Sequence, residues 1–402
     1  SWVQQAEFDL DGALASARQA VRLDPDDPQA LAQESRLLFG MGRLKQALKA
    51  AERARQRAPD DALVNSTWGF LQLARGRTEP AKQAFRQAIS QDSTLGEPHL
   101  GLGLALFRQN RAEAAVEEMR KATLLEPKVS LYNSYLGKAY FEIKDDRLAK
   151  KYFAQAKQLD PRDPTPHFYE AVRLQSVNRP VEAARNLQKS IELNDNRAVY
   201  RSRLLLDEDA ATREISLART YIEMGFDKVA NVEAAKSLNV DPANHSAHRF
   251  LSDSYVTRPR HEIARVSELL QAQLLQPLNI NPIQPSLNEI SLKINNGFKA
   301  STFNEYTSLF ERDQTQLLVS GVAGDNKTLA NEIVLSGLKG PLSYSLGQFH
   351  FETDGFRENA DIRHDIYNAF VQIEATQQLT LQTEYRRRKT EHGDIRLRFD
   401  DS

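Results

Sequence analysis

The sequence predicts an α+β multidomain protein in which an all-α superhelix of antiparallel helix pairs is followed by antiparallel strands. Two observations carry this prediction. A pattern recurs every 34 residues over the first two thirds of the chain, and apolar residues recur at every second position after Pro277. One face of a helix repeats about every 3.6 residues, whereas one face of a strand repeats every second residue. We therefore expect two kinds of domain in one chain.

The 34-residue period is read from the residue that ends every second helix. The residues at this position are Pro25, Pro59, Ser93, Pro127, Pro161 and Asp195. Small residues recur in the same register, namely Gly69, Gly103, Gly137 and Ala171 on the first helix of each pair and Ala47, Ala81, Ala115, Ala149 and Ala183 on the second. Small side chains there let paired helices approach closely. A period of this length indicates a solenoid of stacked helix pairs.

This pattern resembles the tetratricopeptide repeat (TPR), which places small, bulky and proline residues at the same positions of a 34-residue unit. The resemblance implies a solenoid over residues 1–277. Its units are a leading half at 1–27, full units at about 28–61, 62–95, 96–129, 130–163 and 164–197, an insertion at 198–210, and two further units at 211–244 and 245–277. We expect residues 1–27 to hold only the second helix of a pair. The missing partner helix, and a start without Met, indicate a truncated N-terminus.

A TPR superhelix implies a concave groove that binds peptides or protein segments and does not catalyse. The lysines and asparagines with which some family members grip a terminal carboxylate are absent here. We expect largely apolar recognition by five groove residues: Phe70, Leu104, Lys138, Phe168 and Val172. The alternative is that they only pack against neighbouring helices.

The insertion at 198–210 joins three leucines to charges of both signs. Its candidate docking residues, for a partner or for a brace against the second domain, are Tyr200, Arg201, Arg203, Asp207 and Glu208. The alternative is a loop packed over a neighbouring repeat.

Residues 278–313 form the predicted linker, which begins in the proline- and asparagine-rich stretch after Pro277. Five strands follow, at about 314–323, 328–338, 342–352, 364–375 and 378–388. Each alternates apolar and polar residues, and short connections alternate with long, charged ones. This arrangement is typical of an outer-membrane β-barrel, although a soluble β-sandwich or twisted sheet alternates similarly. We place Phe349 and Phe351 in the aromatic girdle at a membrane interface.

Five strands cannot close a membrane barrel, because the smallest such barrels have about eight. We therefore expect residues 314–402 to be the first part of a barrel truncated at its C-terminus. Repeats before a barrel resemble the outer-membrane secretion proteins of Gram-negative bacteria, such as exopolysaccharide exporters. That resemblance implies a periplasmic TPR scaffold, partners in its groove, outer-membrane lipid around the strands, and exported polysaccharide or protein as cargo. The alternatives are a soluble TPR adaptor, cytoplasmic or periplasmic, and a transporter like the TonB-dependent receptors.

The composition of the chain and its motifs argue against several other classes of function. The net charge is −1 with a pI near 6.7, so nothing global attracts nucleic acid. The chain has no cysteine, which removes disulfides and thiolate sites. His245 and His248 are three residues apart but lack a third ligand, and no phosphate-binding loop occurs. We expect no metal, no cofactor and no enzymatic activity.

Overall fold

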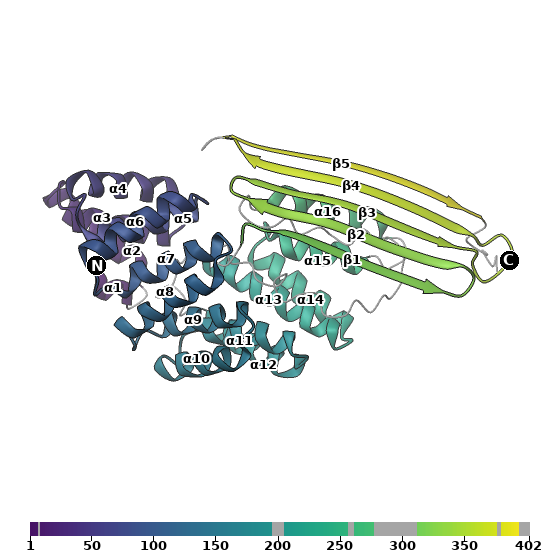
Figure 1. The fold of residues 1–402 in the computed structure, drawn as a ribbon, viewed down its shortest axis with the longest axis horizontal. Helices are drawn as coiled ribbons and strands as arrows, with labels where there is room; N and C mark the ends of the chain where they lie inside the picture. The colour runs from purple at the N-terminus through teal and green to yellow at the C-terminus, as the bar shows by residue number, and fades with distance from the viewer. Residues whose placement is uncertain (7–8, 195–204, 256–260, 277–311, 376–378, 394–402) are drawn as a thin grey trace. The chain divides into compact units, whose positions relative to one another are not determined.

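The computed structural model describes the chain except residues 7–8, 195–204, 256–260, 277–311, 376–378 and 394–402, which are grey in Figure 1. The described residues form two compact units that divide within one helix, between Phe250 and Leu251. The predicted linker, and with it the predicted domain boundary at 277, lies almost wholly outside the described residues and stays a prediction.

The first unit is a stack of antiparallel helix pairs (Figure 1). Its helices are α1 (Trp2–Ala6), α2 (Leu10–Leu23), α3 (Pro28–Gly40), α4 (Leu44–Arg57), α5 (Ala62–Ala74), α6 (Thr78–Gln91), α7 (Gly96–Arg108), α8 (Ala112–Leu125), α9 (Ser130–Glu142), α10 (Asp146–Leu159), α11 (Thr165–Ser176), α12 (Pro180–Glu192), α13 (Leu205–Glu223), α14 (Asp227–Val240) and the start of α15 (His245–Tyr255). The helices α3, α5, α7 and α9 begin 34 residues apart, which confirms the predicted repeat. The prediction that residues 1–27 hold only one helix needs a correction, because α1 precedes α2 there.

The turn inside each helix pair contains one residue in the left-handed backbone region. These residues, with φ between 57° and 83°, are Gly42, Gly76, Asn110, Lys144, Asn178 and Gly225. The first five lie 34 apart, and the last step of 47 equals one period plus the 13 residues of the predicted insertion. Glycine and asparagine tolerate this conformation best, so Lys144 is the least favourable member of the set.

Small residues hold paired helices close together, as the sequence predicts. A Cβ atom added at Gly69 would lie 2.5 Å from the Phe85 ring, and one at Gly137 would lie 2.7 Å from the Phe153 ring. Phe85 and Phe153 are themselves fully buried. The aromatic ring of one helix therefore fills the space that glycine leaves on its partner.

The insertion only partly matches its predicted alternative of a loop. Residues 205–210 form the first turns of α13, which is 19 residues long and the longest helix in the described chain. The rest of the predicted insertion, residues 198–204, lies outside the described residues. None of the described helices is long and apolar enough to cross a membrane.

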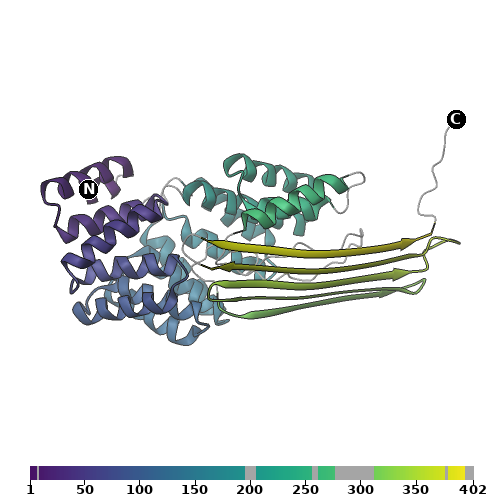
Figure 2. The ribbon, with the colours of Figure 1, turned by 90° about the horizontal axis from the view of Figure 1, so that it is seen from above.

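The second unit contains the end of α15, the helix α16 (Glu262–Leu275) and one antiparallel sheet. Its strands follow one another in sequence order, as Figure 2 shows: β1 (Thr315–Gly324), β2 (Thr328–Lys339), β3 (Leu342–Thr353), β4 (Ile362–Glu374) and β5 (Thr380–His392). This confirms five antiparallel strands. The sheet is not closed, because β1 and β5 each pair with one neighbour only among the described residues.

Connections of different length lie at the two ends of the sheet. Gly340 and Pro341 alone join β2 to β3 at the end that we call the tight-turn end. Residues 325–327 and 354–361 form the connections at the opposite end, which we call the loop end. There Lys327 forms an ion pair with Asp354 at 2.8 Å, so the two loops are joined.

Candidate protein-interaction site

Four of the five predicted groove residues are buried in the solenoid. Leu104, Lys138, Phe168 and Val172 are at most 4% exposed, and the three apolar ones belong to its main hydrophobic cluster. A buried side chain cannot contact a partner without rearrangement. The prediction therefore needs a correction for these four residues, and their burial favours the alternative that they pack against neighbouring helices.

Lys138 shows why its charge is tolerated in the core. Its ammonium group forms an ion pair with Glu142, one helical turn later on α9, and lies 4.9 Å from the centre of the Phe141 ring. A buried charge is costly unless it is paired, and both contacts compensate it here. Lys138 is thus a structural residue rather than an exposed cation for a ligand.

Phe70 is the one predicted groove residue that stays half-buried. Its ring packs edge-on against Phe85, with ring centres 4.9 Å apart. The contact fixes the ring while part of its surface stays accessible. Phe70 therefore remains a candidate contact for an apolar partner residue.

The first helices of three successive repeats are joined by a polar bridge that the sequence did not reveal. The guanidinium group of Arg36 on α3 donates two hydrogen bonds to the Glu97 carboxylate on α7, at 3.0 and 2.6 Å. Ser66 on the intervening α5 donates to the same carboxylate at 2.9 Å. Burial is the largest single effect and acts to lower the pKa of Arg36, but the charge and the hydrogen bonds of Glu97 together outweigh it and the pKa is raised. The bridge ties these helices together through groups that could otherwise bind a ligand.

The predicted docking residues of the insertion are not tested by the structure. Tyr200, Arg201 and Arg203 lie outside the described residues. Asp207 and Glu208 lie on α13, where the backbone alone is described. Docking by this segment stays a prediction.

Titratable side chains in the last repeats have shifted pKa values. Burial raises the pKa of Glu214 on α13 to about 7, and the nearby charge of Glu233 adds to the effect. Burial lowers the pKa of His245 to about 4. The other histidine of that pair, His248, bonds the Pro242 carbonyl oxygen at 2.9 Å. In the described part of the chain, no three His, Asp or Glu side chains come together as a metal site would require.

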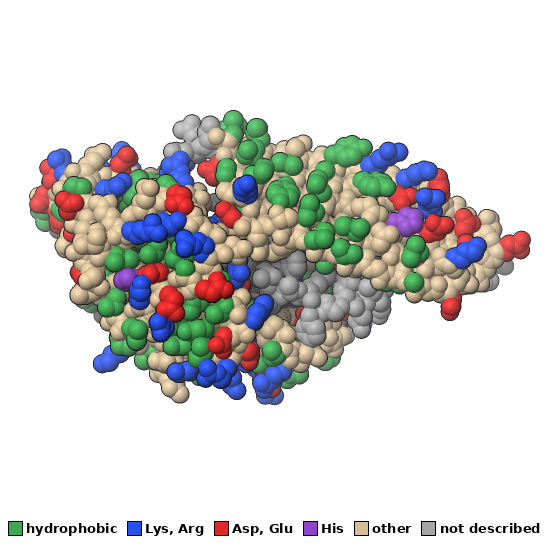
Figure 3. Space-filling view, viewed as in Figure 1, with side chains coloured by type: hydrophobic (Ala, Val, Ile, Leu, Met, Phe, Trp, Pro, Cys, Tyr) green, Lys and Arg blue, Asp and Glu red, His purple; other side chains and the backbone are tan. Residues whose placement is uncertain are grey.

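The sheet has a second candidate surface, its exposed apolar face. Strand register places one residue of each strand in a continuous row across this face: Leu317, Leu335, Leu346, Ala369 and Tyr385. Seven large apolar side chains of the face are 42% to 64% exposed: Leu317, Val319, Ile333, Leu346, Tyr367, Leu381 and Tyr385. Figure 3 shows hydrophobic side chains spread over the strands on this side.

On β2, β3 and β4 the opposite, inner face of the sheet is largely buried although much of it is polar, whereas on the edge strands β1 and β5 it is more exposed. Its fully or nearly fully buried polar residues include Ser336, Ser343, Ser345, His364, Asn368 and Gln372. Phe349 and Phe351 also lie on the inner face, in a cluster with Ala330, Val334 and Ile366. The prediction that these two phenylalanines belong to an aromatic girdle is therefore wrong, since girdle residues would have to point outward. Alternation alone did not show which face carried them.

Comparison with protein-family models identifies the helical part. A model described as "Tetratricopeptide repeat" matches residues 5–67, and a second model with that description matches residues 97–129 and 136–163. The chain contains tetratricopeptide repeats. TPR domains bind protein or peptide partners, so the helical unit is a protein-interaction scaffold.

Curated relatives of these repeats occur in bacteria and plants. The chain is 29% identical over 170 residues to the type IV pilus assembly protein PilF of Pseudomonas aeruginosa, a match of 41% of this chain and 65% of that protein. It is 23% identical over 175 residues to anaphase-promoting complex subunit 6 of Arabidopsis thaliana, or 44% of this chain and 31% of that protein. The chain thus spans less than two thirds of the length of either relative.

A solved structure supports the fold of the repeats. The crystal structure of the APC/C hetero-tetramer Cut9–Hcn1 aligns with a TM-score of 0.55 at 16% identity, over 67% of this chain and 50% of that chain. At this identity the similarity shows a TPR superhelix and nothing about partners.

Proposed function

We propose that this protein is an outer-membrane protein in which the TPR unit recruits a protein partner and the sheet is part of a transmembrane β-barrel used for export or surface assembly. The observation that carries this proposal is the polarity of the sheet. In a water-soluble sheet the apolar face is buried and the polar face is exposed. Here the outer face is apolar and exposed, while the inner face is rich in buried polar side chains.

The extent of the apolar face supports a membrane-spanning role. The strands have 10 to 13 residues, and a transmembrane strand needs about 9 to 11 residues. Along β4 the outward residues run from Ile373 through Val371 and Ala369 to Tyr367 before the charged Asp365 and Arg363 follow. These outward residues span about 20 Å at about 3.3 Å per residue, close to the roughly 25 Å band of such barrels.

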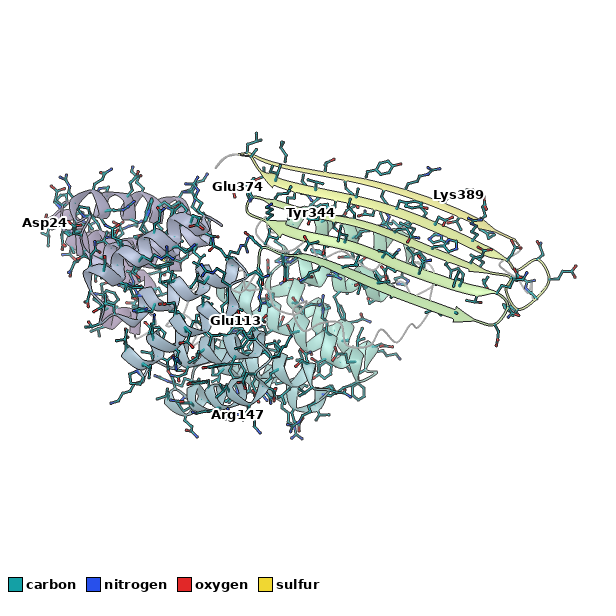
Figure 4. The ribbon with its side chains drawn as sticks, viewed as in Figure 1. Asp24, Glu113, Arg147, Tyr344, Glu374 and Lys389 are labelled. Atoms are coloured by element: carbon teal, nitrogen blue, oxygen red, sulfur yellow. The ribbon has the colours of Figure 1, made fainter. Side chains whose placement is uncertain are left out.

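A tyrosine, rather than the predicted phenylalanines, lies at the edge of this band. Tyr367 lies at this edge and is 50% exposed, whereas the outward Tyr385 lies one position inside it, in the row of Leu346. Arg387 pairs in register with Tyr367, and Lys389 follows nearer the loop end, where Figure 4 shows it. Tyrosine suits the boundary between hydrocarbon and water because one end of its ring is apolar and the other is wet. The loop end is then the external side.

The open edges of the sheet are consistent with a larger barrel. Within the described part of the chain, the outer edges of β1 and β5 present rows of backbone groups without a strand partner, and long edges of this kind pair readily. We propose that further strands of the barrel cover both edges. A barrel removes all edges, which is why it can span a membrane.

The repeats supply the recruitment part of the proposal. One relative is named for pilus assembly in a bacterium. This supports placing the TPR unit in a bacterial cell envelope, with the periplasm as its compartment. The repeats precede β1, whose first residue lies at the tight-turn end, so that end would face the periplasm. We propose no enzymatic role for the chain.

A soluble TPR adaptor is the second candidate. The inner-face cluster of Ala330, Val334, Phe349, Phe351 and Ile366 favours it, because a small apolar core on one face can hold a soluble sheet. In this candidate the repeats alone would carry the function.

Membrane fractionation of the whole protein tests the proposal, followed by a gel that compares boiled and unboiled samples. We expect recovery in the outer membrane and a band whose migration changes on boiling, because closed barrels resist unfolding in detergent until they are heated. A protein recovered in the soluble fraction with one heat-indifferent band would overturn the barrel and leave the adaptor.

A further inference from the structure

The last described helix before the sheet is bonded to the sheet's inner face. Gln382 on β5 donates from its side-chain amide to the Gln273 carbonyl oxygen at 2.7 Å, and Gln372 on β4 donates to the Gln276 carbonyl oxygen at 3.3 Å. In return, the Gln273 side chain donates to Glu384 on β5 at 2.8 Å. All of these groups lie within the second unit.

These contacts provide hydrogen-bond donors for carbonyl groups at the C-terminal end of α16. The last four carbonyl groups of an α-helix have no partner within the helix and must find donors elsewhere. α16 ends at Leu275 with Gln276 as its C-cap, so Gln273 and Gln276 are in this region. Two strand glutamines provide the missing donors. The sheet therefore caps the helix, which a sheet that merely lay nearby would not do.

We call Ser343, Gln372 and Gln382 the seat of α16, and strand register brings them together. Gln372 and Gln382 are register partners on neighbouring strands, so their side chains project together from the inner face. The Gln372 side chain also accepts a hydrogen bond from Ser343 on β3 at 3.3 Å. The three residues lie within three positions of a strand end at the tight turns, near Glu374 as labelled in Figure 4. The seat thus lies at the tight-turn mouth of the proposed barrel.

We propose that α16 is a built-in plug that closes the inner face of the barrel at its tight-turn mouth. This inference rests on the proposed function, since a plug needs a barrel. Helices and loops plug the polar interior of some outer-membrane barrels. Leu269 and Ala272 of α16 are buried, and the polar contacts with β4 and β5 fix the end of the helix.

The seat is suited to release. Two of the three contacts between α16 and the strands join neutral amides to carbonyl groups, and such bonds are weaker than bonds between charged groups. The plug therefore leaves the seat without separating a buried ion pair. Since α16 packs on α15, with Ser252 donating to the Arg265 carbonyl oxygen at 3.1 Å, the plug is also the end of the repeat array.

Cross-linking tests where α16 sits. The chain has no cysteine, so paired substitutions give a clean background. Gln273→Cys with Gln382→Cys is expected to join with a short bismaleimide in the whole protein. Gln273→Cys with Thr383→Cys is the matched control, because Thr383 is the next residue and points to the outer face. If both pairs cross-link equally, or if neither does, α16 does not bind the inner face at Gln382. This conclusion holds whether or not the sheet is in a membrane.

Conductance in planar bilayers tests whether the helix blocks the barrel. The combined variant Gln372→Ala and Gln382→Ala is expected to conduct at least several-fold more often than the wild type, and cross-linking residues 273 and 382 is expected to keep the barrel closed. Ile263→Ser, at a position of α16 that is 88% exposed, is the control and should conduct like the wild type. If the protein inserts and the 273–382 cross-link forms, but all variants conduct equally, the proposal of a plug is wrong while the proposed barrel stands. A heat-indifferent protein that never inserts would overturn the proposed function and the plug with it.

Discussion

Arg36 and Glu97 form a bidentate ion pair across a complete repeat, with the closest nitrogen and oxygen 2.6 Å apart. The two residues are 61 positions apart, on the first helices of units that are not adjacent in sequence, and the Trp2 ring lies 5.6 Å from the guanidinium carbon. The pair uses side chains of the helices that would line a peptide groove. In this part of the solenoid, polar groups of the first helices therefore bind each other.

This pair gives the first prediction. Arg36→Ala is expected to lower the free energy of unfolding by about 1.5–3 kcal/mol, because Glu97 is left partly buried without its charged partner. Urea denaturation of the single and double alanine variants measures the coupling. A double variant that is less destabilised than the sum of the singles would support direct coupling, and strict additivity would contradict it.

Lys144 carries the second prediction. Lys144→Gly is expected to raise stability by about 0.5–1 kcal/mol, because a side chain in the left-handed region is strained and glycine is not. Gly76→Ala at the equivalent turn is the reverse control and should destabilise. Thermal denaturation measures both. A loss of stability in Lys144→Gly would mean that the Lys144 contact with the Phe141 ring, at 5.6 Å, outweighs the strain.

Gly137 carries the third prediction. Gly137→Ala is expected to destabilise by about 1–3 kcal/mol, since the new methyl group would meet the Phe153 ring at 2.7 Å. Helix propensity alone would give the opposite sign, by about 1 kcal/mol. Adding Phe153→Leu should recover part of the loss in chemical denaturation. No recovery would indicate that the backbone, rather than the ring, resists the change.

Glu214 carries a prediction of pH dependence. Its pKa is raised from 4.5 to about 7 in the folded protein, so folding favours the protonated acid. This contribution to stability is complete below pH 4.5 and is lost as pH rises towards and through about 7. Glu214→Gln cannot ionise, so its melting temperature should fall less than that of the wild type between those pH values. Parallel curves for both proteins would contradict the prediction.

The outer face of the sheet carries the fifth prediction, which separates a membrane from water. In vesicles, Leu346→Arg is expected to destabilise the folded protein by about 2–4 kcal/mol, as a cation does near the middle of a bilayer. Gln348→Arg, one outward position nearer the loop end, should cost about 0–1 kcal/mol. Denaturant titration in vesicles measures both. Near-neutral effects of both changes would indicate that water, rather than lipid, covers this face.

The TPR unit was largely readable from the sequence. The period placed the starts of α3, α5, α7 and α9 and the glycines that receive aromatic rings, because each repeat makes the same contacts with its neighbours. The groove contacts were not readable in the same way. Position within a repeat predicts which face of a helix a residue occupies, but not whether that face is covered, and Leu104 and Val172 proved to be buried.

By itself, the sequence determined the repeat, its period, the 13-residue insertion and the presence of five alternating strands, since these follow from local spacing. Tertiary structure decided three other features: the Arg36–Glu97 bridge, the burial of Phe349 and Phe351 on the inner face, and the capping of α16 by Gln372 and Gln382. Each depends on contacts between different elements of the chain. Spacing along a sequence fixes the face on which a side chain lies, whereas its partner is fixed only when the elements pack.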